Sequence, residues 1–163
     1  MVIEEKKDCF GMVDITGKPP VHRTATATGL IRLNELTVEA IRSGRVKKGD
    51  VISTARVAAI LAVKDTPRLI PFCHQIPITA VDVLFDVQQA AVRATVTVTS
   101  VGKTGVEMES LAGVSVALLT VWDMVKYLEK DETGNYPSTE IDDIRVVEKR
   151  KESSEGSCLM DFV

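Results

Sequence analysis

Alternation of apolar and polar residues predicts four strands in this chain. Residues 23–33 place alanine, glycine, isoleucine and leucine on one face and threonines on the other, which is the period of a half-buried strand. The same period runs through residues 81–87 and 92–98, and the short connection between them predicts an antiparallel hairpin. A last strand is expected over residues 141–149.

Capping residues predict two helices between the first strand and the hairpin. Asn34 is placed to cap a short helix that Gly44 ends, and Asp50 to cap a second helix that runs to about Lys64. The prolines that follow predict that regular structure stops within residues 66–77.

A third, longer helix is predicted over residues 106–129. Its segment 111–125 is apolar almost all round. A helix without a polar face is either buried at the centre of a protein or lies between subunits.

The order of these elements indicates an α+β fold of the ferredoxin-like, split βαβ type with an additional helix. We expect an antiparallel or mixed sheet with helices on one face. The predicted organisation is an N-terminal arm (1–22), a single α+β domain that carries the candidate chemistry (23–150) and a polar C-terminal tail (151–163).

Composition excludes several classes of function. The chain has 163 residues, a net charge of −3 and a pI of about 5.5, which argues against a generally basic nucleic-acid binder. No apolar run reaches the ~20 residues of a membrane span, and the first residues lack the apolar core of a signal peptide. The cysteines, Cys9, Cys73 and Cys158, are odd in number and form no C-x-x-C pair. This pattern argues against a disulfide framework or zinc finger and for a reducing, cytoplasmic location.

The first candidate for chemistry is Cys73-His74, which two prolines bracket in a stiff segment. A histidine exchanges protons near pH 7, and such a segment can hold it in place. The alternative is a buried loop with a hydrogen-bonded core histidine. A nucleophilic Cys73 is disfavoured because adjacent side chains diverge, which places His74 poorly as its base.

The second candidate is the turn 102–105 ahead of the long helix, because a helix start presents backbone N–H groups that bind anions. Glu107 and Glu109 either complement the helix dipole, or bind the amide edge of a guanine or move protons. Basic residues elsewhere are either solvated surface charges or, with Arg23, cations for a triphosphate: Lys47, Lys48, Lys103, Lys149, Arg150 and Lys151.

The third candidate is the pair Asp123 and Lys126, which lie at i and i+3 and can contact each other on one helix face. They form either a salt bridge at the wet end of the helix or a site where burial lowers the pKa of the lysine for proton exchange. Glu109 and Asp123 lie roughly 21 Å apart along the helix on nearly the same side. One small ligand cannot contact both, so we hypothesise an active site at a subunit interface, formed by antiparallel copies of this helix.

Four stretches are similar to signature motifs of one family: Lys48-Gly-Asp-Val-Ile-Ser-Thr-Ala-Arg56, Leu69-Ile-Pro-Phe-Cys-His74, Lys103-Thr-Gly-Val-Glu-Met-Glu109 and Leu118-Leu-Thr-Val-Trp-Asp-Met-Val-Lys126. On these motifs the chain resembles cyclic pyranopterin monophosphate synthase, the protein C family of molybdenum cofactor biosynthesis. The resemblance spans about residues 12–149. Gln75 stands where many members have proline, and a longer charged segment follows Lys149.

The resemblance implies a specific reaction. The substrate would be (8S)-3′,8-cyclo-7,8-dihydroguanosine 5′-triphosphate, a cyclised dihydro-GTP, and the product cyclic pyranopterin monophosphate, with pyrophosphate released and no redox change. Family members are homohexamers built as trimers of dimers, with active sites at dimer interfaces. The resemblance implies no tightly bound cofactor and leaves open whether Mg²⁺ accompanies the triphosphate.

The resemblance also assigns roles by motif position. It makes Lys48 and Lys126 the general acid/base lysines and Asp123 the catalytic aspartate. It places Phe72, Cys73, His74, Glu107, Met108, Glu109, Arg23 and Lys149 in contact with the substrate, the last two as phosphate or pterin contacts.

Two other functions remain open from the residues. One is a non-catalytic, oligomeric ferredoxin-like module that binds a nucleotide, which would not explain why Lys48, His74, Asp123 and Lys126 all fall in matching motifs. The other is an RNA-binding ferredoxin-like domain. The low aromatic content of 4% and the acidic pI count against RNA binding.

Overall fold

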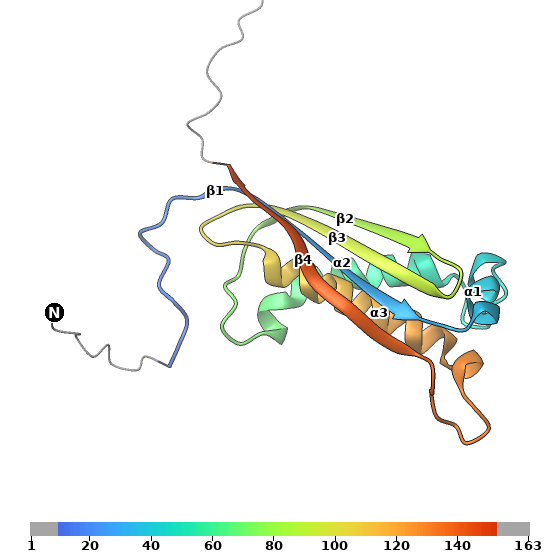
Figure 1. Cartoon of the computed structure of the whole chain (residues 1–163). Coiled ribbons are helices and arrows are strands. Elements are labelled where there is room, and N and C mark those ends of the chain that lie inside the picture. Colours follow the sequence, from blue (N-terminus) through green and yellow to red (C-terminus); the bar gives the residue numbers. More distant parts are fainter. Residues whose placement is uncertain (1–9, 153–163) are drawn as a thin grey trace, which may run out of the picture.

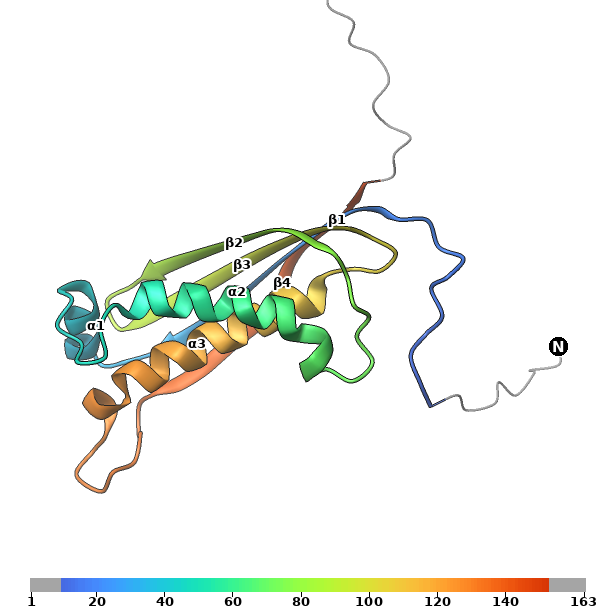
Figure 2. The same cartoon turned by 180° about the vertical axis from the view of Figure 1, so that it is seen from behind.

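The computed structural model describes residues 10–152, which form a four-stranded sheet whose one face is covered by two long helices (Figures 1 and 2). The strand order is β2-β3-β1-β4, and every neighbouring pair is antiparallel. The strands and helices are β1 (Val21–Arg32), α1 (Glu35–Arg42), α2 (Val51–Leu69), β2 (Ile78–Val87), β3 (Ala91–Gly102), α3 (Glu107–Glu129) and β4 (Glu140–Glu152). This is the predicted ferredoxin-like α+β fold, with α1 as the additional helix.

The small residues of β1 allow α3 to lie directly on the sheet. Ala25 and Ala27 are buried on the face that α3 covers. At Gly29, a Cβ atom would lie 2.7 Å from Val114 Cγ1 and 2.9 Å from Leu118 Cδ1, so no larger residue fits without moving the helix. The alternation of small residues with threonine therefore sets the distance between the helix layer and the sheet.

Local signals placed most helix ends correctly. Asp50 caps α2, because its Oδ1 accepts a hydrogen bond from Ser53 N at 2.9 Å. Gly44 follows the end of α1 with a φ of +66°, the left-handed conformation that glycine favours there. Asn34 precedes α1 as expected, but its side chain makes no capping hydrogen bond.

The end of α2 differs from the prediction. The helix continues past Lys64 to Leu69 and includes Pro67. A proline in the last turn removes one hydrogen bond, to the carbonyl four residues before it, and leaves few following residues to disturb. Ile70 N donates to Thr66 O at 2.9 Å and closes the helix, so regular structure does not stop at residue 66.

The first and last strands in the sequence extend beyond the domain boundaries that we drew. β1 begins two residues before Arg23, and β4 continues two residues beyond Arg150. The parts of the predicted arm and tail at residues 1–9 and 153–163 lie outside the described residues.

α3 is apolar on both its buried side and its exposed side. One side is buried against the sheet and α2, through Gly113, Val114, Ala117, Leu118, Val121 and Val125. The other side is apolar but accessible, and Leu119 there is 56% exposed. Among residues 10–152, α3 alone is long and apolar enough to cross a membrane, but its packing is that of a core helix with an uncovered outer face.

A buried carboxylate joins the C-terminal end of α3 to the rest of the fold. Glu129 is 2% exposed and accepts hydrogen bonds from Asn34 N at 3.1 Å, Asn34 Nδ2 at 3.3 Å and Thr139 Oγ1 at 2.5 Å. These contacts connect the start of α1, the end of α3 and the approach to β4. Asn34 does not cap its own helix with its side chain, because Glu129 holds its Nδ2 and its Oδ1 accepts from Ser138 Oγ at 3.3 Å.

We expect Glu129→Ala to lower the free energy of unfolding by about 2–3 kcal/mol, because it leaves a backbone N–H and a hydroxyl without their charged acceptor. Thr139→Val removes one donor and keeps the shape, so it should cost about 1 kcal/mol. Urea unfolding followed by circular dichroism measures both. Equal losses in the two variants would contradict the central role of the carboxylate.

Candidate active site

A cavity of about 420 Å³ opens at the N-terminal end of α3. It lies between the turn that precedes α3 and the irregular segment that follows α2. Its walls are Phe72, Cys73, His74, Ile76, Thr104, Gly105, Glu107, Met108 and Glu109. The Cys-His segment and the start of the long helix, which were predicted as separate candidates, thus line one cavity.

His74 is fixed by a segment far away in the sequence. Its Nε2 lies 2.8 Å from the carbonyl oxygen of Val13. A carbonyl only accepts hydrogen bonds, so Nε2 carries the proton and Nδ1 is left to accept one. His74 is half-buried on the cavity wall, and the alternative of a core histidine is therefore wrong.

Cations from two strands and a turn surround the same end of α3. Arg23 Nε donates to Gly102 O at 3.0 Å, and Lys103 Nζ donates to Thr16 O at 2.8 Å. Lys149 forms an ion pair with Glu107. These cations therefore lie around the start of α3, beside a cavity whose own charged lining residues are Glu107 and Glu109.

The two glutamates at the start of α3 lie in different environments. Burial opposes ionisation of Glu107, but Lys149, its own backbone N–H and Arg23 outweigh it and lower its pKa. Glu109 is 2% exposed, and burial, together with the charge of Glu107, raises its pKa. Two carboxyls with pKa values moved in opposite directions are a common arrangement for paired acid and base roles.

Cys73 is a thiol in this environment. Burial raises its pKa, and the charge of Glu109 adds to the effect. A raised pKa disfavours the thiolate, which supports the prediction that Cys73 is not a nucleophile.

A second cluster lies at the opposite end of α3. Asp123 Oδ2 accepts a hydrogen bond from Lys48 Nζ at 2.6 Å, and its Oδ1 lies 2.8 Å from Lys126 Nζ. The two lysines lower the pKa of Asp123 to about 2, Lys126 contributing more. The carboxylate in turn raises the pKa of Lys126. The salt-bridge alternative is therefore confirmed, and a lysine with a pKa lowered by burial is wrong for this chain alone.

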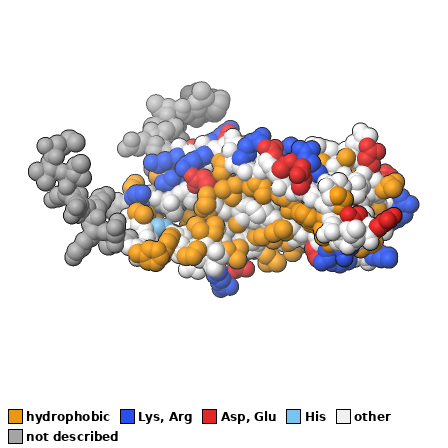
Figure 3. Space-filling view, turned by 60° about the horizontal axis from the view of Figure 1, so that its bottom comes forward, with side chains coloured by type: hydrophobic (Ala, Val, Ile, Leu, Met, Phe, Trp, Pro, Cys, Tyr) orange, Lys and Arg blue, Asp and Glu red, His pale blue; other side chains and the backbone are white. Residues whose placement is uncertain are grey.

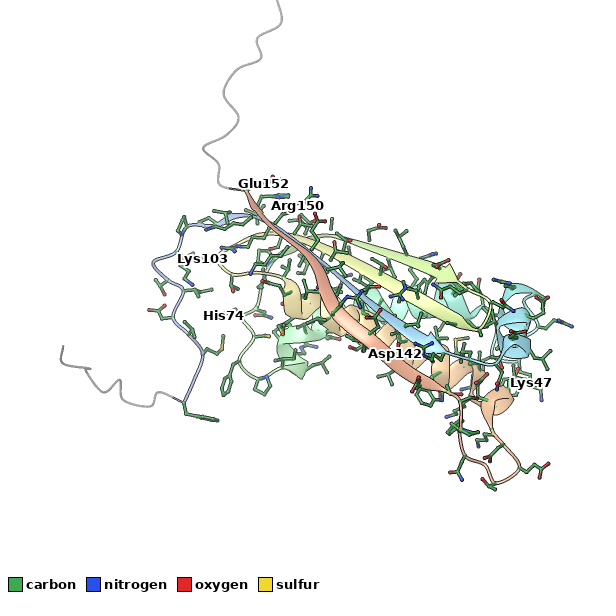
Figure 4. All side chains as sticks on the ribbon, viewed as in Figure 1. Lys47, His74, Lys103, Asp142, Arg150 and Glu152 are labelled. Atoms are coloured by element: carbon green, nitrogen blue, oxygen red, sulfur yellow. The ribbon has the colours of Figure 1, made fainter. Side chains whose placement is uncertain are left out.

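The predicted site residues thus fall into two groups. Figure 4 shows His74 and Lys103 at one end of the molecule and Lys47, the neighbour of Lys48, at the other. Because α3 rises ~1.5 Å per residue, roughly 21 Å separates Glu109 from Asp123. The structure brings Lys48, Asp123 and Lys126 together, and places the other predicted residues at the cavity end.

Lys103, which the sequence offered as either a surface charge or a triphosphate cation, lies in the turn beside the cavity. Sequence reasoning missed two contributors. The carbonyl of Val13 left no signal, because any residue supplies a carbonyl. Tyr127 contacts the residue before Lys48, since Lys47 N donates to Tyr127 Oη at 3.0 Å. Its position four residues after Asp123 was the signal that could have found it.

The described residues contain no group of three or more His, Cys, Asp and Glu side chains placed to hold a metal ion.

Comparison with known proteins now gives this geometry a family. The model of the MoaC family matches residues 12–152. The chain belongs to the MoaC family. A Methanococcoides burtonii relative is 64% identical over 91% of this chain and 93% of the relative. An Aeropyrum pernix relative is 63% identical over 86% of this chain and 97% of the relative. Both are named "Probable cyclic pyranopterin monophosphate synthase".

The match to the MoaC family includes both ends of α3 and the strands that carry Arg23 and Lys149. It also includes Val13, whose carbonyl fixes His74. One MoaC-family chain therefore contains a cavity at one end of α3 and a lysine–aspartate–lysine cluster at the other, and the two do not meet within it.

We expect Glu109→Gln to stabilise the protein at neutral pH. The pKa of Glu109 is raised in the folded protein, so folding favours its protonated form. Glu109 therefore gives its full stabilisation below its usual pKa of about 4.5, and this stabilisation is lost as the pH rises through the raised pKa. The melting temperature of Glu109→Gln should therefore exceed that of the wild type by a margin that grows between pH 4 and pH 7. Glu132→Gln, in an exposed loop, is the control. A margin independent of pH would contradict this interpretation.

Proposed function

We propose that this MoaC-family protein is a cyclic pyranopterin monophosphate synthase of molybdenum cofactor biosynthesis. It converts the cyclised dihydro-GTP to cyclic pyranopterin monophosphate and releases pyrophosphate. The observation that carries the proposal is the arrangement of its charged groups: an anion-binding cavity at one end of α3 and two lysines on one aspartate at the other. The names of the relatives support the same reaction.

The cavity end suits the triphosphate. Closing a cyclic phosphate and expelling pyrophosphate develops negative charge that fixed cations stabilise. Arg23, Lys103 and Lys149 supply those cations around the start of α3, and substrate phosphate takes the place of Glu107 as the partner of Lys149. His74 lies on the cavity wall, and because Val13 O holds its Nε2, Nδ1 is the ring nitrogen that faces the substrate.

The lysine cluster suits the ring chemistry. Opening the imidazole ring requires a proton for the departing nitrogen, and closing the pyrazine ring requires a proton to be removed. Asp123, with a pKa of about 2, is ionised across the physiological range and raises the pKa of Lys126, which favours the protonated lysine in the resting protein. One lysine then donates its proton to the substrate, and the resulting amine can act as the base.

A second copy of the chain completes the site. One exposed stripe of α3 runs from Met108 through Ser115 and Leu119 to Asp123, and so joins the two half-sites. Figure 3 shows a broad apolar surface on the helix side of the molecule. A two-fold axis near Val116 would lay two such stripes antiparallel and bring Asp123 of one protomer to the cavity of the other. The small side chains near the axis allow the helices to approach closely.

We further propose that these dimers assemble into a hexamer, that the enzyme works in the cytoplasm without a tightly bound cofactor, and that Mg²⁺ enters with the triphosphate. Oxygen atoms of a substrate triphosphate are the usual ligands of Mg²⁺ where the protein offers few.

Turnover of the cyclised dihydro-GTP tests the reaction. Wild-type protein should release pyrophosphate and form a product that becomes a fluorescent pterin on oxidation. Lys48→Ala and Lys126→Ala should each reduce kcat by about 10²-fold or more, because each removes a proton-transfer group. Lys130→Ala, just beyond the end of α3, should retain full activity. GTP binding without turnover by folded wild-type protein would favour the nucleotide-binding module instead.

Leu119→Glu tests the interface. A charge on each side of the two-fold axis should dissociate the dimer, because burial of an unpaired carboxylate is unfavourable. Light scattering should show a smaller species, and activity should fall with it. Leu36→Glu, at an 85% exposed position on α1, is the matched control. A Leu119→Glu protein with wild-type mass would contradict the interface.

A further inference from the structure

The backbone turn that presents Lys48 is unusually well fixed for an exposed segment. Val46 anchors it in the core at 6% exposed, and Gly49 N donates to Val46 O at 3.0 Å. Gly49 has a φ of +99°, which glycine adopts without strain. The cap at Asp50 then begins α2 directly after the turn. These contacts fix the backbone around Lys48 but do not fix the end of its side chain.

α3 contacts this turn at two points, one helical turn apart. Asp123 holds the Lys48 ammonium by its carboxylate at 2.6 Å and by its backbone carbonyl at 2.9 Å. Tyr127 holds the backbone, since its Oη accepts the Lys47 N–H at 3.0 Å. The Lys47 ammonium also lies 5.2 Å from the centre of the Tyr127 ring. Residues four apart share a helix face, so both contacts come from the same side of α3.

We propose that Tyr127 is a positioning residue for Lys48. It fixes the peptide just before Lys48 and so sets the point from which the lysine stem reaches Asp123. The inference rests on the proposed function only in that Lys48 takes part in proton transfer. Its structural part concerns the unliganded protein.

The energetics explain why a second contact matters. The Lys48–Asp123 pair is half exposed, and exposed pairs gain little because a long side chain must give up rotamer freedom. A lysine stem has four flexible bonds, so its ammonium is a poorly placed point charge unless its backbone is fixed. A proton donor displaced by about 1 Å can lose much of its effect.

Tyr127→Phe separates the hydroxyl from the ring. It keeps the aromatic surface and the contact with the Lys47 ammonium, and removes only the acceptor for the Lys47 N–H. Lys47→Ala is the matched control, because it removes the ammonium over the ring but keeps the backbone N–H. If the hydroxyl acts through Lys48, only Tyr127→Phe changes the behaviour of Lys48.

The first readout is the ammonium signal of Lys48 in protein labelled with ¹⁵N-lysine, assigned with Lys48→Arg. Held by Asp123, this ammonium should exchange slowly with water and give a visible signal near pH 6. We expect the signal to broaden in Tyr127→Phe and to persist in Lys47→Ala. An unchanged signal in Tyr127→Phe would overturn the proposal whether or not the protein turns over substrate.

The second readout is kinetic. Tyr127→Phe should lower kcat about 3- to 10-fold with little change in KM, since it disturbs a reacting group rather than the phosphate contacts. Combined with Lys48→Ala, it should cause no further loss, because residues that act through one another are not additive. A further loss of the same size in the Lys48→Ala background would show a general structural role and overturn the proposal. A protein without synthase activity but with the expected ammonium signals would remove the proposed function and leave the positioning intact.

Discussion

A straight helix cannot bring its own two ends together, and in this protein that constraint decides where chemistry is possible. α3 lies on β1 at a distance set by Gly29, where even a methyl group would lie 2.7 Å from Val114 Cγ1. Packing this close keeps the helix rigid and holds its ends apart. In the proposed reaction, each end carries half of the charged groups that take part. Assembly of two chains is therefore part of the chemistry in this account.

The two half-sites differ in their electrostatics. At the cavity, Lys149 and Arg23 lower the pKa of Glu107 against the effect of burial, whereas burial raises the pKa of Glu109. At the other end, one aspartate with a pKa of about 2 contacts two lysines. A phosphate chain fits the first environment and a heterocycle that exchanges protons fits the second. Bringing them together places positive charge at one end of the substrate and proton donors at the other.

Much of the fold was predictable because local rules agreed with the global pattern. The alternation in β1, the cap at Asp50 and the glycine at position 44 are each read from neighbouring residues, and each was confirmed. Pro67 misled the prediction, because its effect depends on how much helix follows it. The contact between Asn34 and Glu129 was not predicted for a related reason, because 95 residues separate the two in the sequence.

The site was predictable to the extent that side-chain chemistry carries it. Asp123 and Lys126 lie within one helical turn, so their contact follows from spacing. The contact of His74 with a backbone carbonyl does not, because backbone atoms carry no sequence signal. The separation of the two ends followed from helix geometry. The surface that meets the outer face of α3 belongs to the proposed assembly. Within one chain, its sign is the exposed apolar stripe on that face.

The most direct test of a shared site is complementation between inactive subunits. Asp123→Asn and His74→Ala lie in different half-sites, and each variant alone should be inactive. Co-expressed at equal levels, they should assemble at random, and every mixed dimer would contain one intact site, giving about a quarter of wild-type activity. Mixed oligomers with no more activity than the two parents would contradict the account, because both half-sites would then have to come from one chain.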